Sequence, residues 1–170
     1  VASNHPKAVI DHFVSYPYLE RVIEKGDVSA SILVSGGRQI DLMIQAPESF
    51  GSLLQHFTGS KNHNVRLREY ALKKNLSLSE YGIKDKKSKI QKFDTEEKFY
   101  QAIGLQWIPP ELREDTGEVE LATKHSLPTL IELEDLKGDL HIHSNYPIEP
   151  SHDFGLSSME NMLKKAKDLG

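Results

Sequence analysis

The stretch from Phe57 to Arg68 combines backbone and side-chain groups that suit a nucleotide ligand. Gly59 and Ser60 form a turn between two helical patterns. Such a turn exposes backbone N–H groups to anions and lets a ligand approach the main chain closely. Asn64 and Arg68 are four residues apart, so they share one face of the second helix. Their amide and guanidinium groups suit base edges and backbone oxygens, and Phe57 can stack on a sugar or base. The spacing alone also fits an ordinary helix–turn–helix junction.

Two histidines near the end of the sequence, His141 and His143, could hold a metal ion. Residues 139–143 alternate as in a strand, which would place both imidazoles on one face. Neutral imidazole is a common metal ligand, with zinc or manganese as the candidate ions. Most isolated His-x-His pairs are surface or core histidines, so the pair by itself does not define a site.

Asp41 is a carboxylate on a predicted strand. In residues 38–45 the aliphatic side chains of Ile40, Leu42 and Ile44 alternate with other residues and define one face. Asp41 therefore lies on the opposite face. On this evidence alone it is an ordinary surface aspartate.

The elements that must position these residues follow from periodicity and turn signals. Helices are predicted at residues 6–14 and 18–25, and strands at residues 27–34 and 38–45 around a glycine turn. Further helices are predicted at residues 48–57 and 62–74. In the second of these, Val65, Ala71 and Leu72 are expected to point inward.

The rest of the sequence predicts two short strands, at residues 77–83 and 89–93, around a lysine-rich turn. Residues 94–97 have the spacing of a capping box and open a helix that stops at Gly104. Residues 105–136 are expected to be irregular but packed, because Leu105, Trp107 and Ile108 are costly to expose. A strand at residues 139–143 and a helix capped at Ser157–Glu160 complete the pattern. Met162, Leu163, Ala166 and Leu169 line one side of that helix.

Composition narrows the class of protein. With 170 residues, 38% hydrophobic and 27% charged, the chain fits one or two globular domains and not a collagen, a coiled coil or a disordered protein. We expect no integral membrane protein, because no apolar run is long enough to cross a bilayer. The absence of cysteine excludes disulfide scaffolds, thiol catalysis and cysteine-ligated metals, and fits a cytoplasmic protein.

Charge is concentrated in the middle of the chain. Residues 61–92 carry ten basic and three acidic side chains, although the whole chain has a net charge of −4. Such a block indicates a surface for a polyanion, with a solvated helix face and a lysine-rich turn as the alternative.

The motif Phe-Thr-Gly-Ser at residues 57–60, followed by Asn64, Arg68 and Leu-Ser-Glu-Tyr at residues 78–81, resembles the thumb of family X DNA polymerases, the DNA polymerase beta family. The resemblance implies that His56 and Phe57 flank the sugar of the incoming nucleotide and that Gly59 and Ser60 shape its pocket. It implies that Asn64 contacts the minor-groove edge of the incoming base and Arg68 the template strand. His56 replaces the tyrosine usual in eukaryotic relatives, and Lys61 replaces an acidic residue.

Residues 38–42, Arg-Gln-Ile-Asp-Leu, resemble the last palm strand of the same family. By this resemblance Asp41 is the third catalytic aspartate, which binds the catalytic magnesium ion and acts as base toward the primer 3′-hydroxyl. The first two aspartates would precede Val1. Gln39 stands where eukaryotic relatives carry an arginine near the primer end.

Residues 138–144, Gly-Asp-Leu-His-Ile-His-Ser, resemble the opening motif of the polymerase-and-histidinol-phosphatase (PHP) domain. Bacterial and archaeal family X polymerases carry that domain after the thumb. The resemblance implies that His141 and His143 bind Zn²⁺ or Mn²⁺, with His152 and Asp153 as candidates for further ligands. Residues 105–120 resemble the inter-domain segment of these polymerases.

These resemblances predict an α+β segment of a longer protein. Residues 1–47 would end a nucleotidyltransferase palm with its β-hairpin, and residues 48–104 would form a helical thumb with a small sheet. Residues 105–137 would be a connector, and residues 138–170 the first strand and helix of a PHP domain. The longer protein would be a repair DNA polymerase that fills short gaps, using primed or gapped DNA, a deoxynucleoside triphosphate and Mg²⁺; the segment alone would be inactive. Two alternatives remain: a PHP phosphoesterase or 3′-5′ exonuclease with a degenerate clamp, and a non-catalytic DNA-binding module.

Overall fold

The computed structural model describes residues 1–138, 141–147 and 154–170. Its helices and two small antiparallel sheets confirm the predicted α+β class. The chain divides into two compact units, Val1–Leu127 and Pro128–Gly170.

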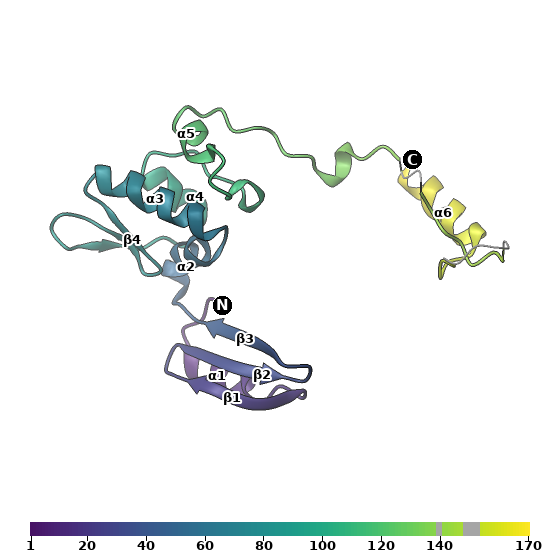
Figure 1. Cartoon of the computed structure of the whole chain (residues 1–170), viewed down its shortest axis with the longest axis horizontal. Coiled ribbons are helices and arrows are strands. Elements are labelled where there is room, and N and C mark those ends of the chain that lie inside the picture. Colours follow the sequence, from purple (N-terminus) through teal and green to yellow (C-terminus); the bar gives the residue numbers. More distant parts are fainter. Residues whose placement is uncertain (139–140, 148–153) are drawn as a thin grey trace. The chain divides into compact units, whose positions relative to one another are not determined.

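The first sheet carries Asp41. It contains β1 (Leu19–Lys25), β2 (Ser29–Val34) and β3 (Arg38–Met43), antiparallel in the order β1-β2-β3 (Figure 1). Helix α1 (Pro6–Phe13) packs against this sheet, and Ile10 forms a buried cluster with Ala30 and Ile44. The helix therefore covers part of the aliphatic face, and Asp41 lies on the opposite face.

The turn between β2 and β3 sets the register that places Asp41. Gly36 and Gly37 have φ angles of +90° and +73°, which favour glycine, and the Gly37 N–H donates to the Val34 carbonyl at 3.1 Å. In the resulting register Ser31 lies opposite Asp41. The predicted strands and the predicted face of Asp41 are confirmed.

The helix predicted at residues 18–25 is wrong, because this segment is strand β1. It pairs antiparallel with β2 from Leu19 opposite Val34 to Lys25 opposite Ala30, with two irregularities in the register. Val22 and Ile23 favour the pleated conformation, and the open edge of β2 supplies backbone partners that a short isolated helix lacks. Tertiary pairing thus overrides the local helical spacing.

The second half of the first unit is a helical layer beside a small sheet. It contains the 3₁₀ helix η1 (Pro47–Ser49), α2 (Phe50–Phe57), α3 (Lys61–Lys73) and α4 (Glu96–Ala102). The sheet has the order β4-β5-β6, formed by Ser77–Ser79, Gly82–Lys84 and Ile90–Gln91. The hydrophobic cluster in the core of this part consists of Leu67, Ile83, Phe93, Phe99, Tyr100, Ile103, Leu105, Ile108, Val119 and Ala122.

The buried face of α3 differs from the prediction. Ala71 is buried as expected, but Val65 and Leu72 are 45% and 62% exposed. The inward stripe is His63, Leu67 and Ala71, spaced four residues apart, which is the spacing that keeps side chains on one face of a helix. His63 was overlooked because a histidine does not count toward an apolar stripe.

The strand predicted at residues 77–83 is in fact two strands, β4 and β5, joined by a tight turn. Gly82 has a φ of +143°, and a Cβ at this position would lie 2.1 Å from the Gln91 carbonyl oxygen of β6. The close approach of β6 therefore requires glycine where the chain reverses. Helix α4 is capped by Thr95, one residue after the start of the predicted capping box, and the Thr95 hydroxyl accepts the Lys98 N–H at 3.4 Å.

Residues 105–127 contain more structure than predicted. A 3₁₀ helix, η2 (Pro110–Leu112), is followed by helix α5 (Glu118–Thr123), which buries Val119 and Ala122 in the same core as Leu105 and Ile108. Gly117, with a φ of +104°, precedes α5. The expectation that this segment is packed is confirmed. The expectation that it is irregular is wrong for α5, because a helix of six residues is too short to give a clear signal in the sequence and is stabilised by docking on the core.

The second unit contains the 3₁₀ helix η3 (Leu133–Asp135) and α6 (Met159–Leu169). Helix α6 begins as predicted, with the Ser158 hydroxyl accepting the Asn161 N–H at 3.2 Å. Residues 141–143 are not a strand, since a strand needs a neighbour and no described segment of this unit pairs with them; residues 139–140, 152 and 153 lie outside the described residues. Among the described helices, none is long and apolar enough to span a bilayer.

Candidate nucleotide site

The junction between α2 and α3 is built around Gly59 and Ser60. Gly59 has a φ of +98°, and a Cβ there would lie 2.6 Å from the Cβ of Arg113. The Ser60 N–H donates to the Arg113 carbonyl at 2.8 Å, and the Ser60 hydroxyl accepts the His63 N–H at 3.1 Å. The turn therefore rests on Arg113 and starts α3 with a side-chain cap.

Four predicted side chains gather around this junction. Phe57, at the end of α2, is 59% exposed and its ring lies 4.8 Å from that of His56. One Nη of Arg68 lies 3.3 Å from His56 Nδ1 across the two helices. Asn64 is half-buried, with Gln55 Nε2 donating to its Oδ1 at 2.9 Å. The structure thus brings together the residues that the sequence assigned to one site.

His56 is a titratable side chain at the junction of α2 and α3 whose pKa is shifted. Burial lowers its pKa, the Glu80 carboxylate 4.0 Å away opposes the shift, and Arg68 adds to it. The neutral ring can therefore accept a hydrogen bond from Arg68. That contact keeps the guanidinium beside the junction.

A buried polar layer lies beneath the junction, and sequence reasoning missed it. His63 Nδ1 lies 2.6 Å from Glu118 Oε1, and His63 Nε2 lies 3.2 Å from the Tyr100 hydroxyl. Burial lowers the pKa of His63 despite the Glu118 carboxylate. Burial raises the pKa of Glu118, but its hydrogen bonds from His63 and backbone amides together outweigh this and lower it. The pair is therefore a neutral imidazole that donates to a carboxylate.

Arg113 forms the second part of this layer. It is completely buried, its Nη1 donates to Glu96 Oε1 at 2.6 Å, and its Nε donates to the Ile108 carbonyl at 2.9 Å. The guanidinium also lies 5.3 Å from the centre of the Tyr100 ring. A buried ion pair of this kind fixes geometry more than it adds stability. Arg113 lies in a run of charged residues after Pro110, and this pattern by itself gives no sign that the side chain is buried.

Asp41 lies on the face of the first sheet opposite α1 and is exposed. The Ser31 hydroxyl donates to Asp41 Oδ1 at 2.5 Å, and Gln39 Nε2 donates to the same oxygen at 2.8 Å. These bonds, Ser31 first, lower the pKa of Asp41. The carboxylate is therefore ionised, with Oδ2 outside both bonds.

His141 and His143 approach each other. Their Nε2 atoms are 2.6 Å apart and their ring centres 4.7 Å apart. Two imidazoles that converge in this way can share one cation, although the expected strand does not position them. Within the described part of the chain, no group of three or more histidines, aspartates and glutamates is placed to hold a metal ion.

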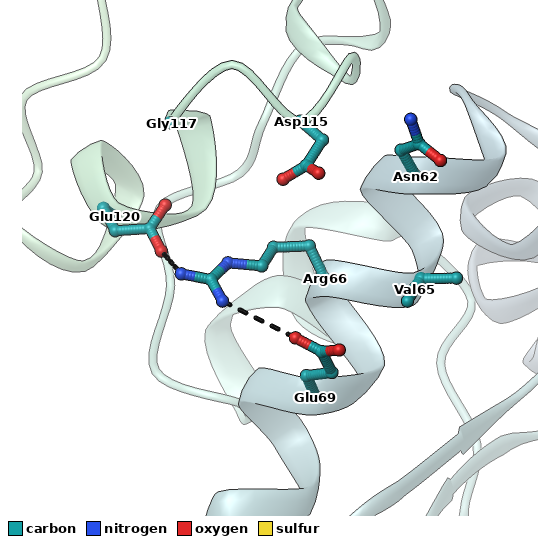
Figure 2. Close-up of a pocket in the computed structure, with 7 residues that line it drawn as sticks. All are labelled: Asn62, Val65, Arg66, Glu69, Asp115, Gly117 and Glu120. Atoms are coloured by element: carbon teal, nitrogen blue, oxygen red, sulfur yellow. Dashed lines mark hydrogen bonds and ion pairs between the residues drawn. The ribbon is translucent and has the colours of Figure 1, made fainter.

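Two residues of the predicted basic surface are held by the protein itself. Arg66 lies in a surface pocket of about 410 Å³ and pairs with Glu69 at 3.5 Å and with Glu120 of α5 (Figure 2). Lys74 Nζ donates to the Ile103 carbonyl at 2.7 Å and lies over the Tyr70 ring. The lysines of the turn at residues 84–89 are exposed.

Known proteins resemble this chain in sequence and in fold. Residues 53–114 match the family model described as DNA polymerase beta thumb. The DNA polymerase/3′-5′ exonuclease PolX of Bacillus subtilis (strain 168) is 38% identical over 149 residues, which cover 86% of this chain and 26% of the relative. The chain therefore spans much less than two thirds of the length of that relative.

Two solved structures of Leishmania infantum polymerase beta share the fold. A ternary P/T complex has a TM-score of 0.54 and 23% identity, covering 67% of this chain and 57% of that one. A ternary gap complex has a TM-score of 0.54 and 22% identity, covering 66% and 53%. At this identity the likeness concerns the fold alone.

The junction of α2 and α3, the match to the thumb model and the shared fold define a thumb of the DNA polymerase beta type. The family of this thumb, matched over residues 53–114, is that of the DNA polymerase beta-like (family X) polymerases. Within that family the chain is similar to PolX.

Proposed function

We propose that this chain is part of a template-directed family X DNA polymerase. Residues 1–47 would be the end of its palm, residues 48–104 its thumb, residues 105–137 a connector and residues 138–170 the start of a PHP domain. The observation that carries the proposal is the gathering of Phe57, Gly59, Asn64 and Arg68 at one helix junction inside the matched thumb. Primed or gapped DNA and a deoxynucleoside triphosphate would be the partners of the longer protein.

At this junction each side chain has a role that its chemistry supports. The exposed ring of Phe57, with His56 beside it, would flank the sugar, and the Gly59–Ser60 turn would shape the sugar pocket. The Asn64 amide would contact the minor-groove edge of the incoming base, where all base pairs present acceptors. Arg68 would contact the template strand from the same helix face.

Asp41 fits a divalent cation, because it is an ionised, exposed carboxylate and Mg²⁺ prefers anionic oxygen ligands. We assign to it the third carboxylate of the polymerase site, with Oδ2 toward the metal. A bound magnesium ion would ease deprotonation of the primer 3′-hydroxyl. Asp41 would accept that proton, and its hydrogen bonds from Ser31 and Gln39 would hold the carboxylate in place.

A second activity is favoured by the two histidines. His141 and His143 converge, and the Bacillus subtilis relative is described as a polymerase and 3′-5′ exonuclease. We infer that these imidazoles supply part of a Zn²⁺ or Mn²⁺ site for phosphodiester hydrolysis, completed by residues elsewhere. A non-catalytic DNA-binding role is the remaining alternative.

The test uses a full-length polymerase that contains this segment. Single-nucleotide incorporation on a primed template should be lost in Asp41→Asn, while DNA affinity stays within about twofold, because a metal ligand and not a phosphate contact is removed. Loss of primer degradation in His141→Ala, with incorporation intact, would place the second activity at the histidines. Incorporation by Asp41→Asn at the wild-type rate would contradict the assignment.

A further inference from the structure

Asn64 is held from below by a buried side chain. Gln55, only 3% exposed, donates from its Nε2 to Asn64 Oδ1 at 2.9 Å. That bond occupies the carbonyl end of the Asn64 amide. The amino end, Nδ2, makes a long contact of 3.4 Å to the Ser60 carbonyl, which uses one of its two hydrogens. The amide therefore offers a donor on its outer side.

Gln55 is itself part of a chain of buried polar groups. Burial raises the pKa of Tyr100, and an interaction with the Gln55 side chain opposes that shift, so the two side chains are neighbours. The Tyr100 hydroxyl lies 3.2 Å from His63 Nε2, and His63 Nδ1 lies 2.6 Å from Glu118 Oε1. A continuous series of contacts thus runs from Glu118 on α5 to Asn64 on α3.

The carboxylate at one end fixes the directions of the two hydrogen bonds that His63 makes. Glu118 accepts the Asp115 N–H at 3.0 Å and the Thr116 N–H at 2.7 Å, so it is anchored as an acceptor. His63 must then donate from Nδ1 and accept at Nε2, which makes Tyr100 the donor to His63 and leaves its oxygen to accept from Gln55. Gln55 in turn donates to Asn64.

We propose that Glu118, His63, Tyr100 and Gln55 form a positioning network that holds the Asn64 amide with its amino group toward the incoming nucleotide. The network makes Asn64 a donor and prevents the flipped amide, which would present an acceptor. A donor there matches purine N3 and pyrimidine O2, the minor-groove acceptors common to all bases. This inference rests on the proposed role of Asn64 and names the residues that select its orientation.

A surface link between the same two helices provides a control. Arg66 on α3 pairs with Glu120 on α5, two residues beyond Glu118 (Figure 2). Glu120→Gln weakens that exposed attachment and leaves the buried series intact. A network that merely docks α5 on α3 would respond to both kinds of change.

The experiment measures incorporation by the full-length polymerase with dATP and with 3-deaza-dATP, which lacks the N3 acceptor. The wild type and Glu120→Gln should prefer dATP by about tenfold in kcat/KM, the value expected for one hydrogen bond. Gln55→Leu should reduce that preference to about twofold or less, chiefly by lowering kcat/KM for dATP. Tyr100→Phe, which keeps the ring packing, should reduce it in the same direction. In an Asn64→Ala background, Gln55→Leu should have no further effect on the preference.

The outcomes separate this inference from the proposed function. If Asn64→Ala keeps the full preference for dATP, the assigned role of Asn64 is wrong. If Asn64→Ala removes the preference while Gln55→Leu and Tyr100→Phe both retain it, the role of Asn64 stands and the positioning network is refuted. A loss of preference in Glu120→Gln equal to that in Gln55→Leu would also refute it, because simple docking would explain both.

Discussion

Asp41 and Asn64 show how neighbouring hydrogen-bond donors decide which group a side chain presents to a ligand. Ser31 and Gln39 both bind Asp41 Oδ1 and keep the carboxylate ionised, whereas Gln55 binds Asn64 Oδ1 and leaves a donor outward. In each case a neighbouring side chain determines the charge or the orientation of the group that faces the site.

Removing the Ser31 hydroxyl should raise the pKa of Asp41 toward its ordinary value of 3.8, because the largest contribution to its lowered pKa is lost. Gln39→Ala should raise it by less. Carboxyl NMR titration of the 170-residue chain measures both, with Asp94, whose pKa is lowered by Lys98, as an internal reference that should not move. An unchanged Asp41 titration in Ser31→Ala would show that the hydrogen bond is absent in solution.

Arg68 and the lysines of the turn should behave differently when replaced by alanine. Arg68→Ala in the full-length polymerase should mainly lower catalytic efficiency and fidelity, because this residue is placed at the template side of the nucleotide site. Lys86→Ala should weaken DNA affinity for all sequences and reduce the slope of log affinity against log salt by about one phosphate contact. If Arg68→Ala changes only the salt slope, Arg68 is a backbone contact.

The exposed site residues could be identified from sequence, and their buried partners could not. Phe57, Asn64 and Arg68 follow from a motif of twelve residues that spans the end of one helix, a turn and one face of the next helix. His63, Tyr100 and Glu118 belong to three different helices, and only the fold shows that they meet. A buried histidine gives no periodic signal that distinguishes it from a surface one.

At the scale of elements, the junction between α2 and α3 depends on close packing against Arg113. Gly59→Ala should destabilise the chain by about 1–3 kcal/mol, because the position combines positive φ with a clash at the Arg113 Cβ. Gly36→Ala is the matched control, since Gly36 also has positive φ but no other atom lies within 4 Å of where its added Cβ would be. Urea unfolding measures both, and equal losses would mean that the contact with Arg113 does not matter.

The pairing of α3 with α5 should make stability depend on pH. The pKa of His63 is lowered below 6.5 by burial, so the folded chain binds fewer protons than the unfolded chain as pH falls below 6.5. The free energy of unfolding should therefore decline from pH 6.5 downward, with a further decline below 4.5 as Glu118 protonates. His63→Gln should flatten the first part, whereas exposed His12→Gln should not; a slope unchanged by His63→Gln would contradict the burial of a neutral histidine.

The elements that sequence predicted well are those whose signals are local. Helix α1 begins at Pro6, the β2–β3 hairpin turns at Gly36 and Gly37, and helix α6 is capped by Ser158. Segment 18–25 could not be assigned correctly from sequence, because its strand conformation depends on pairing with β2. Helix α5 could not be assigned for a related reason: its six residues are stabilised by docking and not by their own propensity.

At the scale of the whole molecule, the two units differ in how much each buries. Every fully buried residue belongs, within the described ranges, to Val1–Leu127, whereas α6 in the second unit has no buried side chain. The 170-residue chain should bind zinc only weakly at neutral pH, because two imidazoles are an incomplete set of ligands. Calorimetry that shows tight binding would reveal a complete site and overturn this prediction.

The same chain should bind duplex DNA weakly and in a salt-dependent manner but should not extend a primer with Mg²⁺. The exposed lysines of residues 84–89 would supply the phosphate contacts, whereas Arg66 and Lys74 are bound within the protein. The salt dependence should therefore correspond to a handful of phosphates. Primer extension by the isolated chain would show that its own carboxylates suffice for catalysis.

The dependence of the Gly59–Ser60 turn on Arg113 also has a consequence for synthesis on the ribosome. The turn is translated well before Arg113, and the carbonyl that receives the Ser60 N–H arrives only with the residues that follow Pro110. The buried histidine of α3, His63, likewise lacks its carboxylate partner until Glu118 has been synthesised. A nascent chain that has emerged only as far as Gly104 therefore exposes an open core to chaperones, and its thumb can close only after α5 leaves the exit tunnel.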